Sequence, residues 1–118
     1  MKTNKHSIWD FASINQKRFQ ALANKVWSTP ETCYTEQLSM RAHVEELKYH
    51  EFSVKTGIAN IPTAVLGEYG KSGPTIAFLG EYDALAGLSQ KADQFRQVPI
   101  KKGGNGHGCC LLYTSDAA

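Results

Sequence analysis

Two carboxylates, Glu81 and Asp83, directly follow the apolar run TIAFLG at residues 75–80. In open α/β sheets the ligand-binding groups gather at the carboxyl ends of strands, so acids at this position could bind a metal, orient a ligand or move protons. Alternation along an extended chain would point both side chains the same way. The same spacing also fits two acids that begin a solvated loop or cap a following helix.

A second group of reactive side chains lies in GGNGHGCC, residues 103–110. His107 and Cys109 are both good ligands for zinc or another divalent transition ion, and the glycines would let the backbone fold tightly around an ion. A metal site needs at least three protein ligands, and His107 alone also fits a solvated loop histidine. The remaining histidines lie on or beside predicted helices without a matching spacing: His6, His43 and His50.

A third candidate is PETCYTEQLS, residues 30–39, in which Glu31 and Glu36 flank an aromatic residue just before a predicted helix. These acids could support a site. The positive end of a helix dipole already favours acids there, however, so we favour a structural role for both.

Composition limits the functions that the chain can have. The 118 residues and 13.0 kDa correspond to one domain or a piece of one. A net charge of +2, from 13 basic and 11 acidic side chains, provides neither a nucleic-acid footprint nor a polybasic membrane anchor. No apolar run approaches the length of a membrane span and the first residues lack a signal-peptide core, so we expect a cytoplasmic protein without nucleic-acid or membrane partners.

The cysteines, Cys33, Cys109 and Cys110, form an odd and sparse set that does not support a disulfide framework. Any chemistry of these sulfurs is thiolate or metal chemistry. We expect Cys33 to be a small buried hydrophobe.

Two helices are predicted in the first half of the chain. Apolar residues recur every three or four positions from Ser7 to Trp27, with Ser7 and Asp10 as a capping pair. After the turn at Thr29–Pro30, Thr35 is expected to cap a second helix. The buried face of that helix would comprise Met40, Val44 and Leu47.

Strands are predicted next. Residues 52–56 alternate as a half-exposed strand does, 63–69 are rich in β-forming residues, and 70–73 supply turn chemistry for a hairpin. The run 75–80, apolar on both faces, predicts a strand buried in the middle of a sheet, and 89–105 predict a long loop. The predicted fold class is therefore α/β, with two helices followed by about three strands of a mixed sheet.

Taken together, PETCYTEQLS, NIPTAVLGEYG, GEYDALAGLSQ and GNGHGC occur in an order that closely resembles the start of M20-family metallopeptidases and amidohydrolases. The resemblance implies that residues 1–109 are the N-terminal part of a zinc-peptidase-like catalytic domain with two metal ions, Zn²⁺ or Mn²⁺. The intact enzyme would hydrolyse the amide bond of a small N-acyl or N-aroyl amino acid. It would work as a homodimer or a hetero-oligomer.

The resemblance also assigns roles to individual residues. Cys109 matches a metal-ligating cysteine, and His107 matches a histidine that either ligates the metal or supports its ligands. Glu81 and Asp83 match an acidic motif that supports catalysis. The family motif continues with a ligand histidine, whereas this chain continues with Cys110 and two leucines.

That departure affects the functional expectation. Residues 110–118 resemble translated adapter read-through, so we expect a non-native tail, and we expect the 118-residue chain to be an inactive fragment of an enzyme. Two alternatives stay open, namely a dipeptidase with the same metal core and a small non-catalytic protein that binds a metal or a partner.

Overall fold

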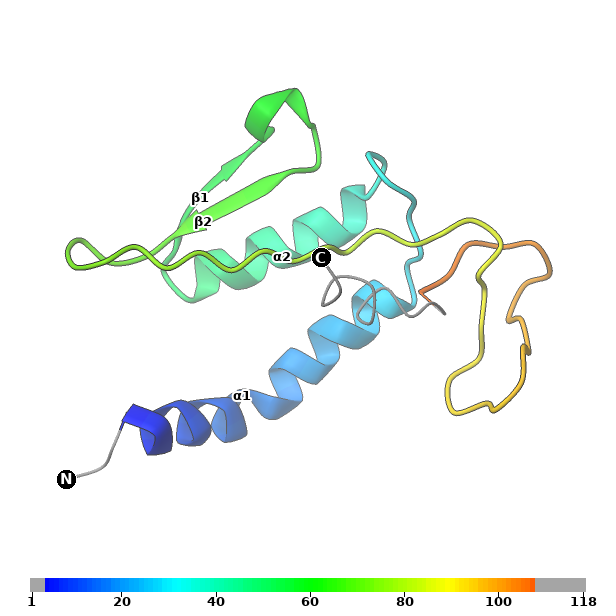
Figure 1. Cartoon of the computed structure of the whole chain (residues 1–118), viewed down its shortest axis with the longest axis horizontal. Coiled ribbons are helices and arrows are strands. Elements are labelled where there is room, and N and C mark those ends of the chain that lie inside the picture. Colours follow the sequence, from blue (N-terminus) through cyan, green and yellow to red (C-terminus); the bar gives the residue numbers. More distant parts are fainter. Residues whose placement is uncertain (1–3, 108–118) are drawn as a thin grey trace.

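A computed structural model describes residues 4–107 and contains two helices followed by a two-stranded antiparallel sheet (Figure 1). The elements, in chain order, are α1 (Asn4–Trp27), α2 (Gln37–Tyr49), β1 (Ser53–Thr56), a 3₁₀ turn (Ile58–Asn60) and β2 (Val65–Glu68). This arrangement confirms the predicted α/β class. Neither α1 nor α2 has the length and apolar character needed to cross a membrane.

Helix α1 is longer at its start than the sequence predicted. It begins at Asn4, so the predicted capping pair of Ser7 and Asp10 is wrong, because both residues lie inside the helix. Its end agrees with the prediction, since the Ser28 amide still donates to Asn24 and the chain then turns at Pro30.

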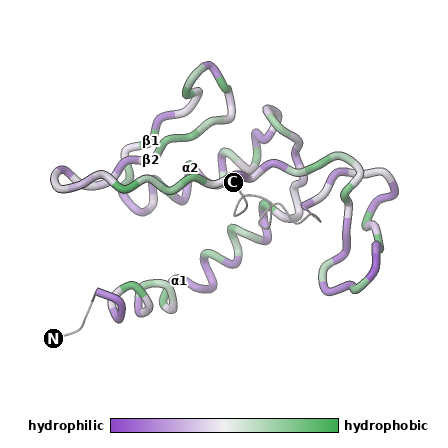
Figure 2. Tube along the Cα trace, in the orientation of Figure 1, coloured by the Kyte–Doolittle hydropathy of each residue, from purple (hydrophilic) through white to green (hydrophobic). Residues whose placement is uncertain are grey.

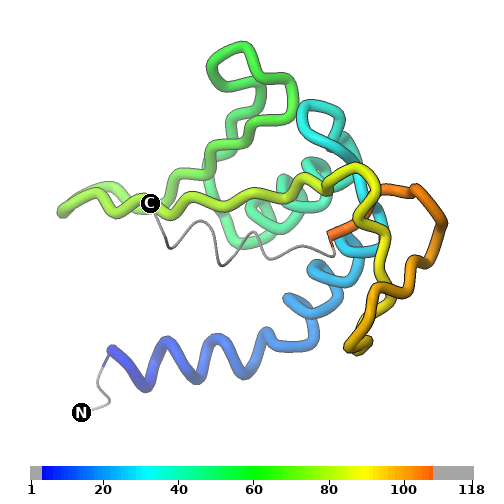
Figure 3. The backbone as a smooth tube through the Cα atoms, turned by 45° about the vertical axis from the view of Figure 1, so that its right-hand side comes forward, coloured from blue at the N-terminus to red at the C-terminus, as the bar shows by residue number. Residues whose placement is uncertain are grey.

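The first turns of α1 extend away from the rest of the chain (Figures 1 and 3). Ile8 and Phe11, predicted for the apolar face, are 65% and 52% exposed. The helix has no fully buried residue, and it meets α2 through its later turns.

A polar and aromatic cluster joins α1 to α2. Arg18 Nε lies 2.7 Å from Glu46 Oε1, and its guanidinium carbon lies 3.4 Å from the centre of the Tyr49 ring. His50 Nε2 lies 3.1 Å from the same Glu46 oxygen, and the Phe19 ring packs against His50 at 5.9 Å. The hydrogen bond from Arg18 holds the pKa of Glu46 below its ordinary value.

The buried face of α2 is rotated from the predicted one. Residue Glu36, not Thr35, occupies the N-cap position, and the buried residues of the helix are Ser39 and Ala42. Ser39 lies one position before Met40, and Ala42 lies two positions from both Met40 and Val44, so the buried face is turned by about 100° or more from the predicted one. The predicted face is only half-buried: Met40, Val44 and Leu47.

Strands β1 and β2 form a hairpin, with Ser53 opposite Glu68 and Thr56 opposite Val65. Both lie within the predicted strand segments. The turn of the hairpin lies between residues 57 and 64, so the predicted hairpin turn at 70–73 is wrong, because no strand follows it among the described residues. The hairpin packs on α2, and a Cβ added at Gly67 would lie 3.1 Å from the Leu47 side chain. Glycine at this position therefore allows the close approach of sheet and helix.

The predicted buried strand at residues 75–80 is wrong. The segment is extended but pairs with no strand among residues 4–107, and Figure 2 shows hydrophobic residues along it. Phe78 and Leu79 are 94% and 98% exposed. The hairpin closes between β1 and β2, and a two-stranded sheet has no position with a strand on either side.

The core of the described residues is small. Ala42 and Ala84 are its buried hydrophobic residues. Cys33, expected to be buried, is exposed in the turn before α2. Hydrogen bonds between loops consequently carry much of the organisation of the chain after β2.

Candidate functional site

Three sequence motifs meet at one backbone junction. The Ala84 amide donates to the Glu31 carbonyl at 2.7 Å, which forms a parallel bridge between Thr32 and Ala84. Leu85 and Gly106 exchange two hydrogen bonds of 3.1 Å in an antiparallel bridge. We name these contacts the motif junction. It brings PETCYTEQ, GEYDALAG and GGNGH side by side from distant parts of the sequence.

The junction depends on glycine at position 106, which is buried. A Cβ at Gly106 would collide with the Leu88 carbonyl oxygen and lie 2.6 Å from Ser89 Cα. The Asn105 side-chain amide adds a bond of 3.3 Å to the Pro30 carbonyl. Gly106 therefore permits the close approach of two backbones, which differs from the tight fold around an ion that we expected of these glycines.

The predicted long loop is ordered by its own side chains. Ser89 Oγ accepts a hydrogen bond from the Lys101 amide at 3.0 Å, and the Gln90 side chain bonds both the Val98 amide and the Arg96 carbonyl at 2.9 Å. The segment has no helix or strand from residue 89 to 105, as predicted. These bonds join the two sides of the loop to each other.

Glu31 has the structural role that we favoured. Its carboxylate accepts the Leu38 amide at 3.0 Å and the Ser39 amide at 2.9 Å, which are free donors in the first turn of α2. Partial burial opposes the charged form, but these backbone hydrogen bonds outweigh it and hold the pKa of Glu31 below its ordinary value.

Glu36 is buried in the same region, and its Oε2 atom has no hydrogen-bond partner among residues 4–107. It makes no side-chain cap bond to α2. The contacts of Glu31 thus show the structural role that we favoured. For Glu36 the same role stays a prediction.

Tyr82 anchors the acidic motif. Its ring stacks on His43 of α2 with centroids 4.9 Å apart and planes at 27°, and its hydroxyl donates to the Thr63 carbonyl. Burial raises the pKa of Tyr82, and the nearby carboxylates of Glu36 and Glu31 raise it further. The phenol is therefore a neutral donor that fixes the segment against α2 and the turn before β2.

The two predicted acids flank this anchor. Glu81 is exposed and Asp83 is half-buried, and neither has a hydrogen bond or ion pair to another residue between 4 and 107. Both carboxylates are thus available to interact with further groups. Their supporting role in catalysis stays a prediction.

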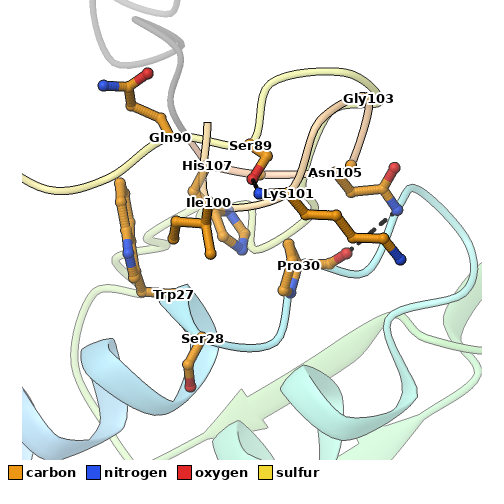
Figure 4. Close-up of a pocket in the computed structure, with 12 residues that line it drawn as sticks. Trp27, Ser28, Pro30, Ser89, Gln90, Ile100, Lys101, Gly103, Asn105 and His107 are labelled. Atoms are coloured by element: carbon orange, nitrogen blue, oxygen red, sulfur yellow. Dashed lines mark hydrogen bonds between the residues drawn. The ribbon is translucent and has the colours of Figure 1, made fainter. Parts of the chain in front are cut away.

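His107 lies at the end of the described residues, beside the C-terminal end of α1. Its ring is tilted against Trp27 at a centroid distance of 6.1 Å, and its Nε2 atom is buried without a hydrogen-bond partner among the described residues. Both rings line a pocket of about 630 Å³ under the loop (Figure 4). Cys109, Cys110 and the tail to Ala118 lie outside the described residues.

The described residues do not by themselves assemble a metal site. No group of three or more His, Cys, Asp or Glu side chains within 4–107 could hold an ion. His107 Nε2 is compatible with a ligand role because it is buried and lacks a partner. The other donors would have to come from outside these residues.

Sequence reasoning missed Tyr82, His43, Ser89 and Gln90. Tyr82 stands between two acids that are more obvious candidates, and its stacking partner is 39 positions earlier, on α2. A run of polar residues such as SQKADQ gives no sign of which side chains bond the loop. No local pattern could have identified these partners.

Comparison with known proteins shows which protein the chain resembles. No family model matches it. Over 102 residues, which are 86% of the chain, it is 39% identical to one of the subunits of p-aminobenzoyl-glutamate hydrolase from Escherichia coli (strain K12), and it spans 21% of that relative's length. The resemblance stated from the sequence is confirmed: over most of its length, the chain is similar to one part of a p-aminobenzoyl-glutamate hydrolase.

Proposed function

We propose that the chain is part of a hydrolase that cleaves the amide bond of p-aminobenzoyl-glutamate or a related N-acyl or N-aroyl amino acid. The observation that carries this proposal is the 39% identity over 86% of the chain to a subunit of such a hydrolase. A dipeptide is the alternative substrate, because the same metal core could serve both reactions.

The motif junction supports the proposal. It places the segments of Glu31, Ala84 and Gly106 in direct backbone contact, and these segments contain the motifs on which the resemblance depends. The junction would thus hold Asp83 and His107 in fixed positions at the edge of a site. Glu81 and Asp83 would orient other groups of that site.

A divalent ion, Zn²⁺ or Mn²⁺, completes the proposed site. When bound, such an ion acidifies water and polarises an amide carbonyl. His107 and Cys109 are the candidate contributors from this chain, and further ligands and a general base would be supplied from beyond residues 4–107. The 118-residue chain alone should therefore be inactive. Association with further subunits is proposed because the relative is itself named a subunit.

A chimera tests the proposal directly. The matching part of the Escherichia coli relative would be replaced by residues 1–107 of this chain, with the relative's own sequence continuing from there. We expect release of p-aminobenzoate from p-aminobenzoyl-glutamate, loss of that activity with a chelator, and recovery on adding Zn²⁺ or Mn²⁺.

Two controls sharpen the result. The isolated 118-residue chain should release no product under the same conditions, and a panel of dipeptides should be cleaved more slowly by the chimera. A folded chimera that assembles normally but hydrolyses neither substrate class would contradict the proposed function. Preference for dipeptides would correct the substrate class.

A further inference from the structure

The pocket beside the motif junction has the features of a binding site. Its volume of about 630 Å³ lies in the range of small-molecule sites. It lies between the C-terminal end of α1 and the loop that runs from Ser89 to His107 (Figure 4). Hydrogen bonds of the loop and the junction fix its walls, so the pocket is already formed without a ligand.

The walls offer an exposed aromatic and aliphatic surface. Trp27 is 40% exposed and Ile100 is 66% exposed, and Pro30 also lines the pocket. A ring-shaped ligand against this surface would bury apolar area of both partners, and aromatic contacts add to that gain. The walls therefore suit a flat aromatic group.

One wall atom also calls for a polar partner. His107 Nε2 is buried and has none among the described residues, and leaving such an atom unpaired is costly. The Trp27 and His107 rings are 6.1 Å apart, which is too close to admit a third ring between them. Because His107 Nε2 is the candidate metal ligand of the proposed site, a ligand ring would lie beside the pair and would leave that atom to the ion.

The charges around the pocket favour one orientation of a bound ligand. Trp27 is the last residue of α1, and the C-terminal end of a helix carries partial negative charge, which disfavours an anion and favours an N–H donor. Lys101, on the loop side of the pocket, has no ion pair among residues 4–107. A carboxylate would therefore point toward Lys101, and the aromatic end toward α1.

We propose that this pocket binds the aryl group of an N-aroyl amino acid, with the ring against Trp27 and Ile100. The identification of this ligand as a substrate rests on the proposed function. Binding of the aryl group itself requires no catalysis, so it can be measured on the 118-residue chain.

The two tryptophans make the measurement specific. The chain, labelled with ¹⁵N, gives one indole N–H signal from Trp27 and one from Trp9, and W9F assigns them. On titration with p-aminobenzoate or N-benzoyl-glutamate, we expect the Trp27 signal to shift with saturation, at a dissociation constant of about 1–10 mM. Trp9, on the projecting part of α1, should not shift, and free glutamate should leave both signals in place.

Variants decide whether the pocket is responsible. W27A would remove the main wall and I100S the second one, and each should weaken binding at least about fivefold as followed by ligand-detected saturation transfer, while W9F should bind normally. Because Ile100 is exposed, I100S should not disturb folding. Equal shifts at Trp9, binding unaffected by both pocket variants, or no shift in a chain with a dispersed spectrum would each overturn the proposal. Binding at Trp27 together with an inactive chimera would overturn the proposed function alone.

Discussion

The run 75–80 and the segment 84–107 contrast in sequence and in structure. The first is apolar throughout and is exposed, with Phe78 at 94%. The second is polar and rich in glycine, yet it makes backbone bridges to Thr32 and within itself, and it encloses a pocket. Hydropathy thus shows which environment a segment requires, whereas position is fixed by specific hydrogen-bond partners.

The difference has a physical origin. A two-stranded sheet provides no covered slot for an apolar strand, so residues 75–80 have nowhere to be buried among the described elements. The glycine-rich segment needs only two matching backbone groups and room for close approach. Changes to single residues can test this contrast.

The largest effect is expected at the junction. G106A places a methyl group against the Leu88 carbonyl and Ser89 Cα, and it should destabilise the junction by about 2 kcal/mol or more. G80A, in the exposed run, meets no atom within 4 Å and is the matched control, with a change within about 0.5 kcal/mol. Amide hydrogen exchange at Ala84 and Leu85 would measure both. Equal protection in the two variants would refute the role assigned to Gly106.

Removing the charge that caps α2 should have the next largest effect. E31Q weakens the acceptor of the Leu38 and Ser39 amides and should cost about 1.5 kcal/mol, whereas E81Q, on an exposed side chain, should be neutral. Urea unfolding followed by the helical circular dichroism signal would measure the difference. If E31Q left the free energy of unfolding unchanged, Glu31 would not be the residue that joins the junction to α2.

The same side chain predicts a pH dependence. The pKa of Glu31 is lower in the folded chain than in the unfolded one, so its contribution is complete above the unfolded value of about 4.3 and is lost as pH falls through the folded value. Thermal unfolding between about pH 6 and pH 3 should show a smaller decline for E31Q than for the wild-type chain. Parallel declines would show that other carboxylates, such as Glu46, dominate.

A smaller effect is expected at the anchor of the acidic motif. Y82F removes the hydrogen bond to the Thr63 carbonyl but keeps the stack on His43, and should cost about 1 kcal/mol. Y34F, at an exposed tyrosine, is its control. Urea titrations of single and double variants with H43A would show coupling between Tyr82 and His43. Strict additivity would contradict the stacked contact.

The smallest effect on folding is expected in the apolar run. F78S should change the stability of the chain by less than about 0.5 kcal/mol, because the ring is almost fully exposed. It should reduce self-association, since exposed apolar strands invite edge pairing. Sedimentation velocity at several concentrations would measure this. A marked loss of stability would mean that the run is buried and would remove the contrast.

The sequence predicted local features well. Helical periodicity identified α1 and α2, alternation identified β1, and the absence of a period identified the long loop. Each of these signals lies within about twenty neighbouring residues. The buried face of α2 was predicted wrongly, because that face is set by the elements packed on the helix rather than by its own most apolar stripe.

The candidate site was only partly predictable. Glu81, Asp83 and His107 were identified as candidates, but the bridges from Ala84 to Thr32 and from Leu85 to Gly106 were not. Such bridges depend on which distant backbone groups have no other partner, and that information is absent from local spacing. The stack of Tyr82 on His43 is likewise a contact between remote segments.

The central claim is that the motif junction positions the residues of a hydrolase site. The most direct test compares p-aminobenzoyl-glutamate hydrolysis by the chimera carrying G106A with hydrolysis by the chimera carrying G80A. We predict at least a roughly tenfold loss of kcat/KM, about 1.4 kcal/mol, for G106A and no change for G80A. Equal activity of the two folded variants would contradict the claim.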